Sequence, residues 1–428
     1  MSTDIMKFRR SLLPKAGGNK FQKIKEQTAE AQQKNPNLKI IKLSIGQPEG
    51  PAIIEACAAA AIAILTRKEN IHEYQDNGMP GCPDFAPRFV QCHVKTKLAN
   101  IPKDVIDYGY LAIPGIKPTI DVVLKALGSW TCVRNTPYQT SIVGTMTEPG
   151  YPTPKDQGVM IKGIELFDLP AIAEKGFLFD PSDIDAVVEQ QFPGRKLGEG
   201  DMLMLNLPLN PAGIVARREW LEKLCAYCEE RGIRLVNDAA YSMLVNSEQA
   251  VTLTDVAVNF PGLNWGEMFS ASKAGNNTGW RIGAVVGSPE FMGDIKRING
   301  NMNSGPVAAM AIGALELFEK YPHKIAEYRD LYHKRLIVLR DILHNAGMRI
   351  AVNPEAGFFL LYDVPKFAFG REIKDAEEFN ALLIEETGVV GVPFGASNQW
   401  IRFAICAADV IALKSEIQRA FEKAQVSY

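Results

Sequence analysis

The sequence lacks the features that direct a chain to a membrane or to nucleic acid. Its 47 basic and 49 acidic residues nearly cancel, giving a net charge of −2, so no large basic surface is indicated. No stretch reaches the roughly 18 uninterrupted apolar residues of a membrane helix. The amino-terminal residues also contain no apolar run of signal-peptide length. We therefore expect a cytoplasmic protein with no nucleic-acid or membrane partner.

Disulfide and metal-binding patterns are missing too. Seven cysteines, an odd number, are scattered along the chain, unlike the framework of a small secreted domain. Cys225 and Cys228 form a CxxC pair, but no second pair and no histidine cluster accompanies it. The pair recurs at helical spacing with Trp220, Leu221 and Leu224. We expect mostly reduced core cysteines and no metal site.

Alternating strand and helix patterns dominate what is present. Four short apolar runs, at residues 41–45, 202–208, 232–238 and 281–287, are separated by longer helical patterns. The alternation predicts an α/β fold, in which a mostly parallel sheet is flanked by helices on both faces. Ligands of such sheets gather beyond the carboxyl ends of the strands.

The length of 428 residues indicates one large domain and a smaller one. A charged amphipathic pattern over residues 316–345 predicts one or two long helices that lead into the second domain. We expect residues 51–315 to form the large domain and residues 316–428 a small α+β domain. Residues 1–50 should form an amino-terminal arm and part of the small domain.

The segment FSASKAGNNTGWRIG carries the clearest candidate chemistry. Lys273 has hydroxyls nearby at Ser270 and Ser272, and Arg281 follows it. A lysine that is deprotonated near neutral pH can form a Schiff base, and an arginine with hydroxyl donors suits a phosphate dianion. Most single lysines are solvated surface residues, so it is the combination that indicates a site.

Two further segments place polar side chains after apolar strands. Asp238, in RLVNDAAY, could pair with a protonated pyridine nitrogen, or it could simply cap the next helix. Tyr241 could place its phenol beside the oxygen of the same ring. Asn210, in NLPLNPAG, could offer its amide to that oxygen, although a plain turn explains the segment equally well.

Together these segments resemble the NPxG, DxAY and SxSK…GxRxG signatures of class I aminotransferases of fold type I, and the similar organisation covers nearly the whole chain. The resemblance implies that Lys273 holds pyridoxal 5′-phosphate as a Schiff base and acts as general acid and base in ping-pong transfer. It also implies further cofactor contacts: Asp238 at the pyridinium nitrogen, Asn210 and Tyr241 at the ring hydroxyl, and Ser270, Ser272 and Arg281 at the phosphate.

Other positions match the family's motifs one by one. Tyr151, in TEPGYPTP, matches the aromatic residue that stacks on the cofactor. Arg402, in QWIRFAI, matches the arginine that binds the substrate α-carboxylate beside Asn210, with a structural salt bridge as the alternative role. Gly46 matches the loop whose backbone meets that carboxylate. Tyr74 matches the tyrosine that reaches the neighbouring subunit's phosphate, which implies a homodimer with shared sites.

The expected phosphate loop, AIPGIKPTID, departs from the common family pattern of a serine or glycine pair followed by threonine. Backbone N–H groups of Ile116 and Lys117 near a helix start could cradle the phosphate, but Pro118 has no N–H to offer. The Gly-x-Lys arrangement beginning at Gly115 resembles LL-diaminopimelate aminotransferases, as does the segment QQKNPNLKIIKLSIGQPEGPA.

The substrates are expected to be an α-amino acid and a 2-oxo acid. Dicarboxylate-specific relatives place a second arginine four residues before a serine, whereas this chain has Gly300 four residues before Ser304. Asn303 and Ser304 remain candidate contacts from the partner subunit. An LL-diaminopimelate aminotransferase using 2-oxoglutarate and an aminotransferase of broad specificity both remain open.

Other classes of protein use the same fold and lysine. They include C–S lyases, decarboxylases and cyclopropane-forming synthases, because the bound cofactor weakens every bond at the α-carbon. A non-enzymatic cofactor-binding regulator is disfavoured, since only about 40 residues precede the segment IKLSIG.

Overall fold

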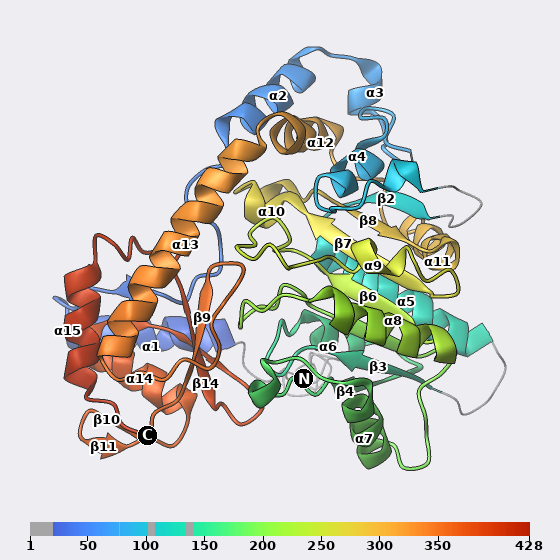
Figure 1. Ribbon diagram of the computed structural model, residues 1–428. Coiled ribbons are helices and arrows are strands. Elements are labelled where there is room, and N and C mark those ends of the chain that lie inside the picture. Colours follow the sequence, from blue (N-terminus) through green and yellow to red (C-terminus); the bar gives the residue numbers. More distant parts are fainter. Residues whose placement is uncertain (1–19, 77, 102–107, 134–139) are drawn as a thin grey trace, which may run out of the picture.

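A seven-stranded sheet forms the centre of the computed structural model, which describes residues 20–76, 78–101, 108–133 and 140–428 (Figure 1). The strand order is β2–β8–β7–β6–β5–β3–β4, and only β8 runs against its neighbours. The predicted α/β fold with a mostly parallel sheet is confirmed. The strands of this sheet are β2 (Gly109–Ile113), β3 (Ser141–Thr145), β4 (Ile164–Asp168), β5 (Met202–Leu205), β6 (Arg234–Asp238), β7 (Trp265–Ser270) and β8 (Gly283–Gly287).

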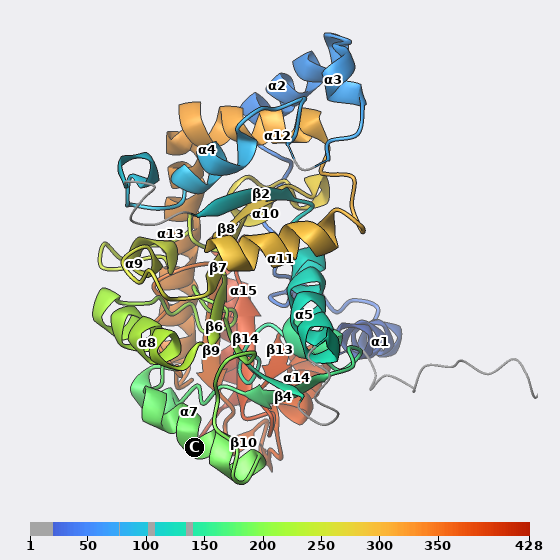
Figure 2. The same cartoon turned by 90° about the vertical axis from the view of Figure 1, so that its right-hand side faces the viewer.

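Both faces of the sheet are buried, which explains why strands such as β5 and β8 contain no polar side chain. In β5, Met202 and Met204 belong to the core beneath α5 and α11, whereas Leu203 and Leu205 belong to the opposite core. Figure 2 shows α5 and α11 on one side of the sheet and α8 and α9 on the other. The helices around the sheet are α4 (Phe85–Gln91), α5 (Ile116–Val133), α6 (Thr153–Gly158), α7 (Pro181–Gln191), α8 (Arg218–Arg231), α9 (Thr254–Ala257), α10 (Ala271–Ala274) and α11 (Pro289–Asn299).

One long helix leads from the sheet to the carboxyl-terminal part of the chain. The predicted helical stretch over residues 316–345 consists of a π-helical turn, Glu316–Lys320, followed by α13, Pro322–Asn345. Figure 1 shows α13 running from α12 down to a second, smaller group of elements. That group contains β9 (Phe359–Asp363), β10 (Phe367–Ala368), β11 (Arg371–Glu372), α14 (Ala376–Thr387), β12 (Val389–Val390), β13 (Val392–Phe394), β14 (Trp400–Ala404) and α15 (Lys414–Ala424).

The run at residues 41–45 is not a strand of the main sheet. Only β1 (Ile41–Lys42) is extended in a ladder, and it pairs in parallel with β12. The next carbonyl groups are used elsewhere: Leu43 O accepts from the Ala404 N–H, and Ser44 O accepts from Arg402. The segment therefore crosses from the smaller group toward the carboxyl edge of the main sheet.

The amino-terminal helix lies against the smaller group as well. Helix α1 (Lys20–Lys34) contacts α14, with exposed ion pairs between Lys23 and Glu377 and between Lys34 and Glu385. At the opposite end of the molecule, α12 packs on α2. The helices of that end are α2 (Ile54–Leu65), α3 (Glu69–His72) and α12 (Ala308–Leu315).

The CxxC pair lies on α8, where Cys225 and Cys228 are both fully buried, as the helical spacing predicted. The six cysteines whose side chains are described form no disulfide, and the side chain of Cys132 lies outside the described residues. Within the described ranges, no group of histidine, cysteine or acidic residues is suited to hold a metal ion. No described helix is long and apolar enough to cross a membrane.

Candidate active site

The strand ends bring the predicted functional segments to one edge of the main sheet. Asp238 ends β6, and Ser270 ends β7 directly before α10, the short helix that carries Lys273. Asn210 follows β5. Because β8 is antiparallel and its start pairs with Ser270, Arg281 returns to the same edge. This edge is where ligands of such sheets bind.

Lys273 is part-buried beside the Gly46 carbonyl and two aromatic rings. Its Nζ donates to the carbonyl of Gly46 at 3.0 Å and lies 5.8 Å from the ring centre of Tyr241 and 6.0 Å from that of Phe358. Burial lowers the pKa of Lys273, and the positive charge of Arg402 acts in the same direction. A lysine held this way loses its proton more readily, as a nucleophilic amine requires.

Asp238 is a buried carboxyl beside that amine. Its Oδ1 accepts from the Ala240 N–H at 3.1 Å, an interaction that also fits the capping role considered from the sequence. Burial raises the pKa of Asp238 to about 7, while Lys273 lowers it. A cationic group placed against this carboxyl would favour its charged form. The neighbouring Tyr241 is also buried, and burial raises the pKa of its phenol, which stays protonated and able to donate.

The amino terminus of α5 lies against Arg281, and we call these two together the α5 cradle. Gly115 has φ +88°, and a Cβ at this position would lie 2.5 Å from Nη2 of Arg281, so glycine lets the guanidinium approach the helix start. The first-turn amides of Ile116 and Lys117 have no partner within their own helix. Pro118 falls in this same turn, where a missing N–H removes no helical hydrogen bond. The departure from the family pattern therefore leaves the cradle intact.

Hydroxyl groups and an aromatic ring complete the same region. Ser270 Oγ caps α10 by accepting from the Ser272 N–H at 3.1 Å, and both serines are buried. Burial raises the pKa of Tyr151, and the charges of Asp238 and Arg281 both act on its phenol. Tyr151 therefore lies within the electrostatic influence of both charged groups.

Arg402, on β14, is a buried guanidinium with neutral partners. Its Nη1 donates to Asn210 Oδ1 at 3.0 Å, and its Nη2 donates to Ser44 O at 2.9 Å. Its Cζ lies 4.2 Å from the ring centre of Phe359 and 5.1 Å from that of Phe394. Burial lowers the pKa of Arg402 to about 10. No carboxylate among the described residues pairs with it, so the salt-bridge alternative is not observed.

Gly46 lies between the lysine and the arginine. A Cβ at this position would approach within 2.8 Å of Cζ of Phe359 and 3.8 Å of Nη2 of Arg402. Only glycine lets the backbone pass this ring. Sequence reasoning did not identify Phe359 as part of the site, because its contact with Arg402 appears only once β9 and β14 are paired.

The loop that carries Gly46 is tied to two other elements. The backbone N–H of Glu49 donates to the phenol oxygen of Tyr332 at 3.1 Å, and its side chain forms an ion pair with Arg335, both on α13. Asn276, in the lysine loop, donates to Glu49 O at 2.7 Å. The contacts of Glu49 with Tyr332, Arg335 and Asn276 were not predicted, because these residues lie in three separate segments of the sequence.

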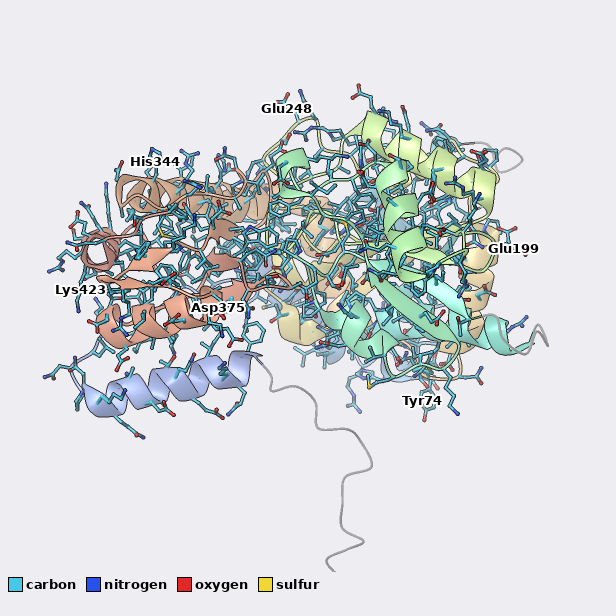
Figure 3. The ribbon with its side chains drawn as sticks, turned by 90° about the horizontal axis from the view of Figure 1, so that it is seen from below. Tyr74, Glu199, Glu248, His344, Asp375 and Lys423 are labelled. Carbon is cyan, nitrogen blue, oxygen red and sulfur yellow. The ribbon has the colours of Figure 1, made fainter. Side chains whose placement is uncertain are left out.

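Tyr74, Asn303 and Ser304 do not join this group within one chain. Tyr74 is 78% exposed and lies at the rim of the molecule (Figure 3). Asn303 is half-buried and donates to Asn299 Oδ1 at 3.0 Å, while Ser304 is exposed. The backbone of Lys117 belongs to the cradle, but its side chain is exposed.

Comparison with known proteins places these features in context. The family model "Aminotransferase class I and II" matches residues 146–415, more than half of the chain. An LL-diaminopimelate aminotransferase of Methanocaldococcus jannaschii is 27% identical over 90% of this chain and 85% of its own length. An LL-diaminopimelate aminotransferase of Syntrophobacter fumaroxidans is 27% identical over 90% of this chain and 91% of its own length.

Solved structures have the same fold. Substrate-bound BacF from Bacillus subtilis superimposes with a TM-score of 0.77 at 20% identity, covering 98% of this chain and 99% of that one. An aspartate aminotransferase from Thermotoga maritima gives a TM-score of 0.73 at 19% identity and covers 99% of both chains.

Proposed function

The chain belongs to the class I and II aminotransferase family, and from this membership we propose how its residues share the work of moving an amino group. The protein is a pyridoxal-phosphate-dependent aminotransferase. When bound, the cofactor supplies a carbonyl carbon that condenses with amines and a pyridinium ring that stabilises negative charge at the substrate α-carbon. The residues at the sheet edge fit this group in shape and charge.

We propose that Lys273 anchors the cofactor and then moves the proton. Its lowered pKa supports a neutral Nζ, which can form the covalent link and, once released, accept the proton from the substrate α-carbon. The carboxylate of Asp238 would hold the ring nitrogen, and Asn210 and Tyr241 would hold the ring hydroxyl. Ser270, Ser272, Arg281 and the amides of Ile116 and Lys117 would hold the phosphate, and Tyr151 would cover the ring.

The observation that carries the proposal is the buried Arg402 with neutral partners. An anion offsets the desolvation of a buried guanidinium, and the guanidinium fork suits the two oxygens of a carboxylate. Gly46 lies between Arg402 and Lys273, so a carboxylate bound there has its α-carbon beside the amine. Asn210 holds one arm of the fork.

A half-reaction tests transamination directly. Given an amino donor alone, the enzyme should lose the absorption of its cofactor–lysine link and release one 2-oxo acid per site. Repeated release of ammonia and pyruvate without any acceptor would instead identify a C–S lyase. Binding of the cofactor without conversion of any amino acid would identify a regulator.

We propose LL-diaminopimelate as donor and 2-oxoglutarate as acceptor. The named relatives support this choice. The glycine at position 300, where dicarboxylate-specific relatives have arginine, disfavours an ordinary aspartate aminotransferase. A donor panel that includes aspartate and alanine separates the two open alternatives. LL-diaminopimelate should give a kcat/KM about tenfold or more above those of aspartate and alanine, because one or two additional specific hydrogen bonds account for a difference of that size. Equal values would identify an aminotransferase of broad specificity.

We further propose a homodimer with shared sites. Helix α2 is apolar nearly throughout, yet Ile54, Ile62 and Leu65 are 72%, 63% and 77% exposed. Tyr74 and Val307 add to this surface at 78% and 58% exposure. Soluble proteins rarely leave such a surface uncovered, and a two-fold dimer would bury it against itself. Sedimentation should give twice the mass of the 47.1 kDa chain.

A further inference from the structure

At the α2–α12 end, the exposed Tyr74 is followed in the sequence by Gln75, a buried residue with many hydrogen bonds. Tyr74 is 78% exposed, whereas Gln75 is 4% exposed. The Nε2 of Gln75 donates to the carbonyls of Asn70 at 2.8 Å and of Glu73 at 2.9 Å, and its Oε1 accepts from the Gly81 N–H at 2.9 Å. Every hydrogen-bonding direction of this amide except one lone pair is therefore used.

The backbone of Gln75 joins a second segment more than 200 residues away in the sequence. Its N–H donates to the carbonyl of Ser304 at 3.0 Å. Gly305 has φ +85°, and a Cβ there would collide with the carbonyl of Gln75, so the two strands of backbone touch only because residue 305 is glycine. We call these contacts, made by Asn70, Glu73, Gln75, Gly81, Ser304 and Gly305, the Gln75 cluster.

The same cluster rests on α12. A Cβ at Gly81 would lie 2.6 Å from Cβ of Ala308, the first residue of that helix. The segment with Tyr74 and the segment with Asn303 and Ser304 therefore cannot move independently of each other or of α12. Satisfied buried polar networks of this kind rigidify their surroundings.

We propose that Gln75 is a positioning residue for the neighbouring subunit's site. It holds Tyr74 together with Asn303 and Ser304 as one rigid unit, which presents the phenol to the partner's cofactor phosphate and the other two side chains to the far end of the partner's substrate. Fixing these groups before association removes the entropy cost of ordering them in the complex. The inference rests on the proposed shared-site dimer. If it is correct, replacing Gln75 weakens the binding of both the cofactor and the substrate, although Gln75 contacts neither of them.

Hybrid dimers, purified through two different affinity tags, test this inference. In the first hybrid, one chain is wild type and the other carries both Lys273→Ala and Gln75→Ala. The site that keeps Lys273 is then completed by Tyr74, Asn303 and Ser304 of the chain that carries Gln75→Ala. In the second hybrid, Gln75→Ala is on the chain that keeps Lys273, and the partner carries only Lys273→Ala, so the working site receives an intact unit.

The first hybrid should show a KM for the amino donor, and a dissociation constant for the cofactor, each raised about tenfold, the effect of misplacing one or two charged hydrogen bonds. The cofactor constant is read from the absorption of the cofactor–lysine link, which forms only in the chain that keeps Lys273. The second hybrid should match a hybrid without any change at Gln75. Equal defects in both hybrids would mean that Gln75 acts only within its own chain and would overturn the inference.

Two further variants keep the test decisive. If the Gln75→Ala chain folds poorly, Gln75→Glu replaces it, because a carboxylate still accepts from the Gly81 N–H but cannot donate to Asn70 and Glu73. Gln91 offers a matched control: it donates to Val94 O and Thr96 O and accepts from the Leu98 N–H, so these bonds involve no residue of the Gln75 cluster. Gln91→Ala should shift neither constant in either hybrid.

Failure of the dimer gives a different result from failure of the inference. A wild-type protein that sediments as a monomer contradicts the shared-site dimer itself, and no hybrid then forms. A stable dimer whose two hybrids behave alike contradicts only the role of Gln75.

Discussion

The sheet edge and the α2–α12 end treat buried polar groups in opposite ways. At the sheet edge, Asp238 and Arg402 are buried with few or only neutral partners. At the other end, Gln75 has nearly all of its partners, and apolar side chains are exposed instead. The sheet edge therefore leaves charged groups without a charged hydrogen-bond partner, as a ligand-binding site requires. The α2–α12 end has its buried polar groups hydrogen-bonded and exposes an apolar surface that another chain could cover.

The largest expected effect is at Lys273. Lys273→Ala should lower turnover by a factor on the order of 10⁴ or more, because it removes both the anchor and the proton acceptor. It should also abolish the borohydride-reducible link to the cofactor, measured by mass spectrometry. Lys320→Ala, an exposed lysine paired with Glu316, is the control and should keep both. A variant of Lys273 that retained the link would break the assignment of the whole edge.

The pH dependence of Asp238 sharpens the idea of unmatched charge. Burial raises the pKa of its carboxyl to about 7 from 3.8, so in the cofactor-free protein its contribution to stability is greatest below the ordinary pKa and is lost as the pH rises toward 7. Relative to Asp238→Asn, the wild type should lose up to about 4 kcal/mol of unfolding free energy between about pH 4 and pH 8.

Denaturant titrations of the two proteins at several pH values measure this difference. Cofactor should reduce it, because a pyridinium cation favours the charged carboxylate. If the difference in unfolding free energy between the two proteins did not change with pH, the carboxyl of Asp238 would have the same pKa in the folded and unfolded states.

Arg402 tests the same property with a smaller effect. Arg402→Lys loses the two-pronged geometry, and we expect the affinity for the amino donor to fall by about 2–3 kcal/mol. Titration of the cofactor absorption with donor gives the constant. Arg371→Lys, at an exposed position on β11, should leave it unchanged. If donor affinity survived at Arg402→Lys, the residue would be structural.

The smallest expected effect concerns the exposed surface. Leu65→Ala removes a 77% exposed side chain from α2 and should weaken dimer association by about 1–2 kcal/mol for each buried leucine. Val159→Ala, at a 71% exposed position beside α6, is matched in exposure and should have no effect. Analytical ultracentrifugation over a dilution series compares the two. Similar constants for both variants would mean that the α2 surface is not the interface.

The chain order of strands and motifs was enough to predict the fold and the edge where the motifs meet. The runs at residues 202–208, 232–238 and 281–287 became β5, β6 and β8, because each is short, apolar and buried on both faces. The run at 41–45 is also short and mostly apolar. Its role differs because its carbonyls serve Arg402 and Ala404 in place of the main sheet.

Contacts between distant segments could not be predicted. Phe359 matters because it lies against Gly46 and Arg402, and Gln75 matters because it bonds to Ser304. Neither residue was predicted to be part of a site, and a single sequence carries no sign of these pairings. The exposure of α2 could not be predicted either, because the sequence of an apolar helix does not show whether another part of the chain covers it.

The reversed direction of β8 has a practical consequence for protein engineering. Lys273 and Arg281 stand at the two ends of one loop, and each end is held by a strand of the same hairpin, β7 or β8. Between the anchors, Asn276 is already committed, since it donates to Glu49 O. Gly279, where a Cβ would meet no atom within 4 Å, is the natural place to graft a longer or differently charged segment.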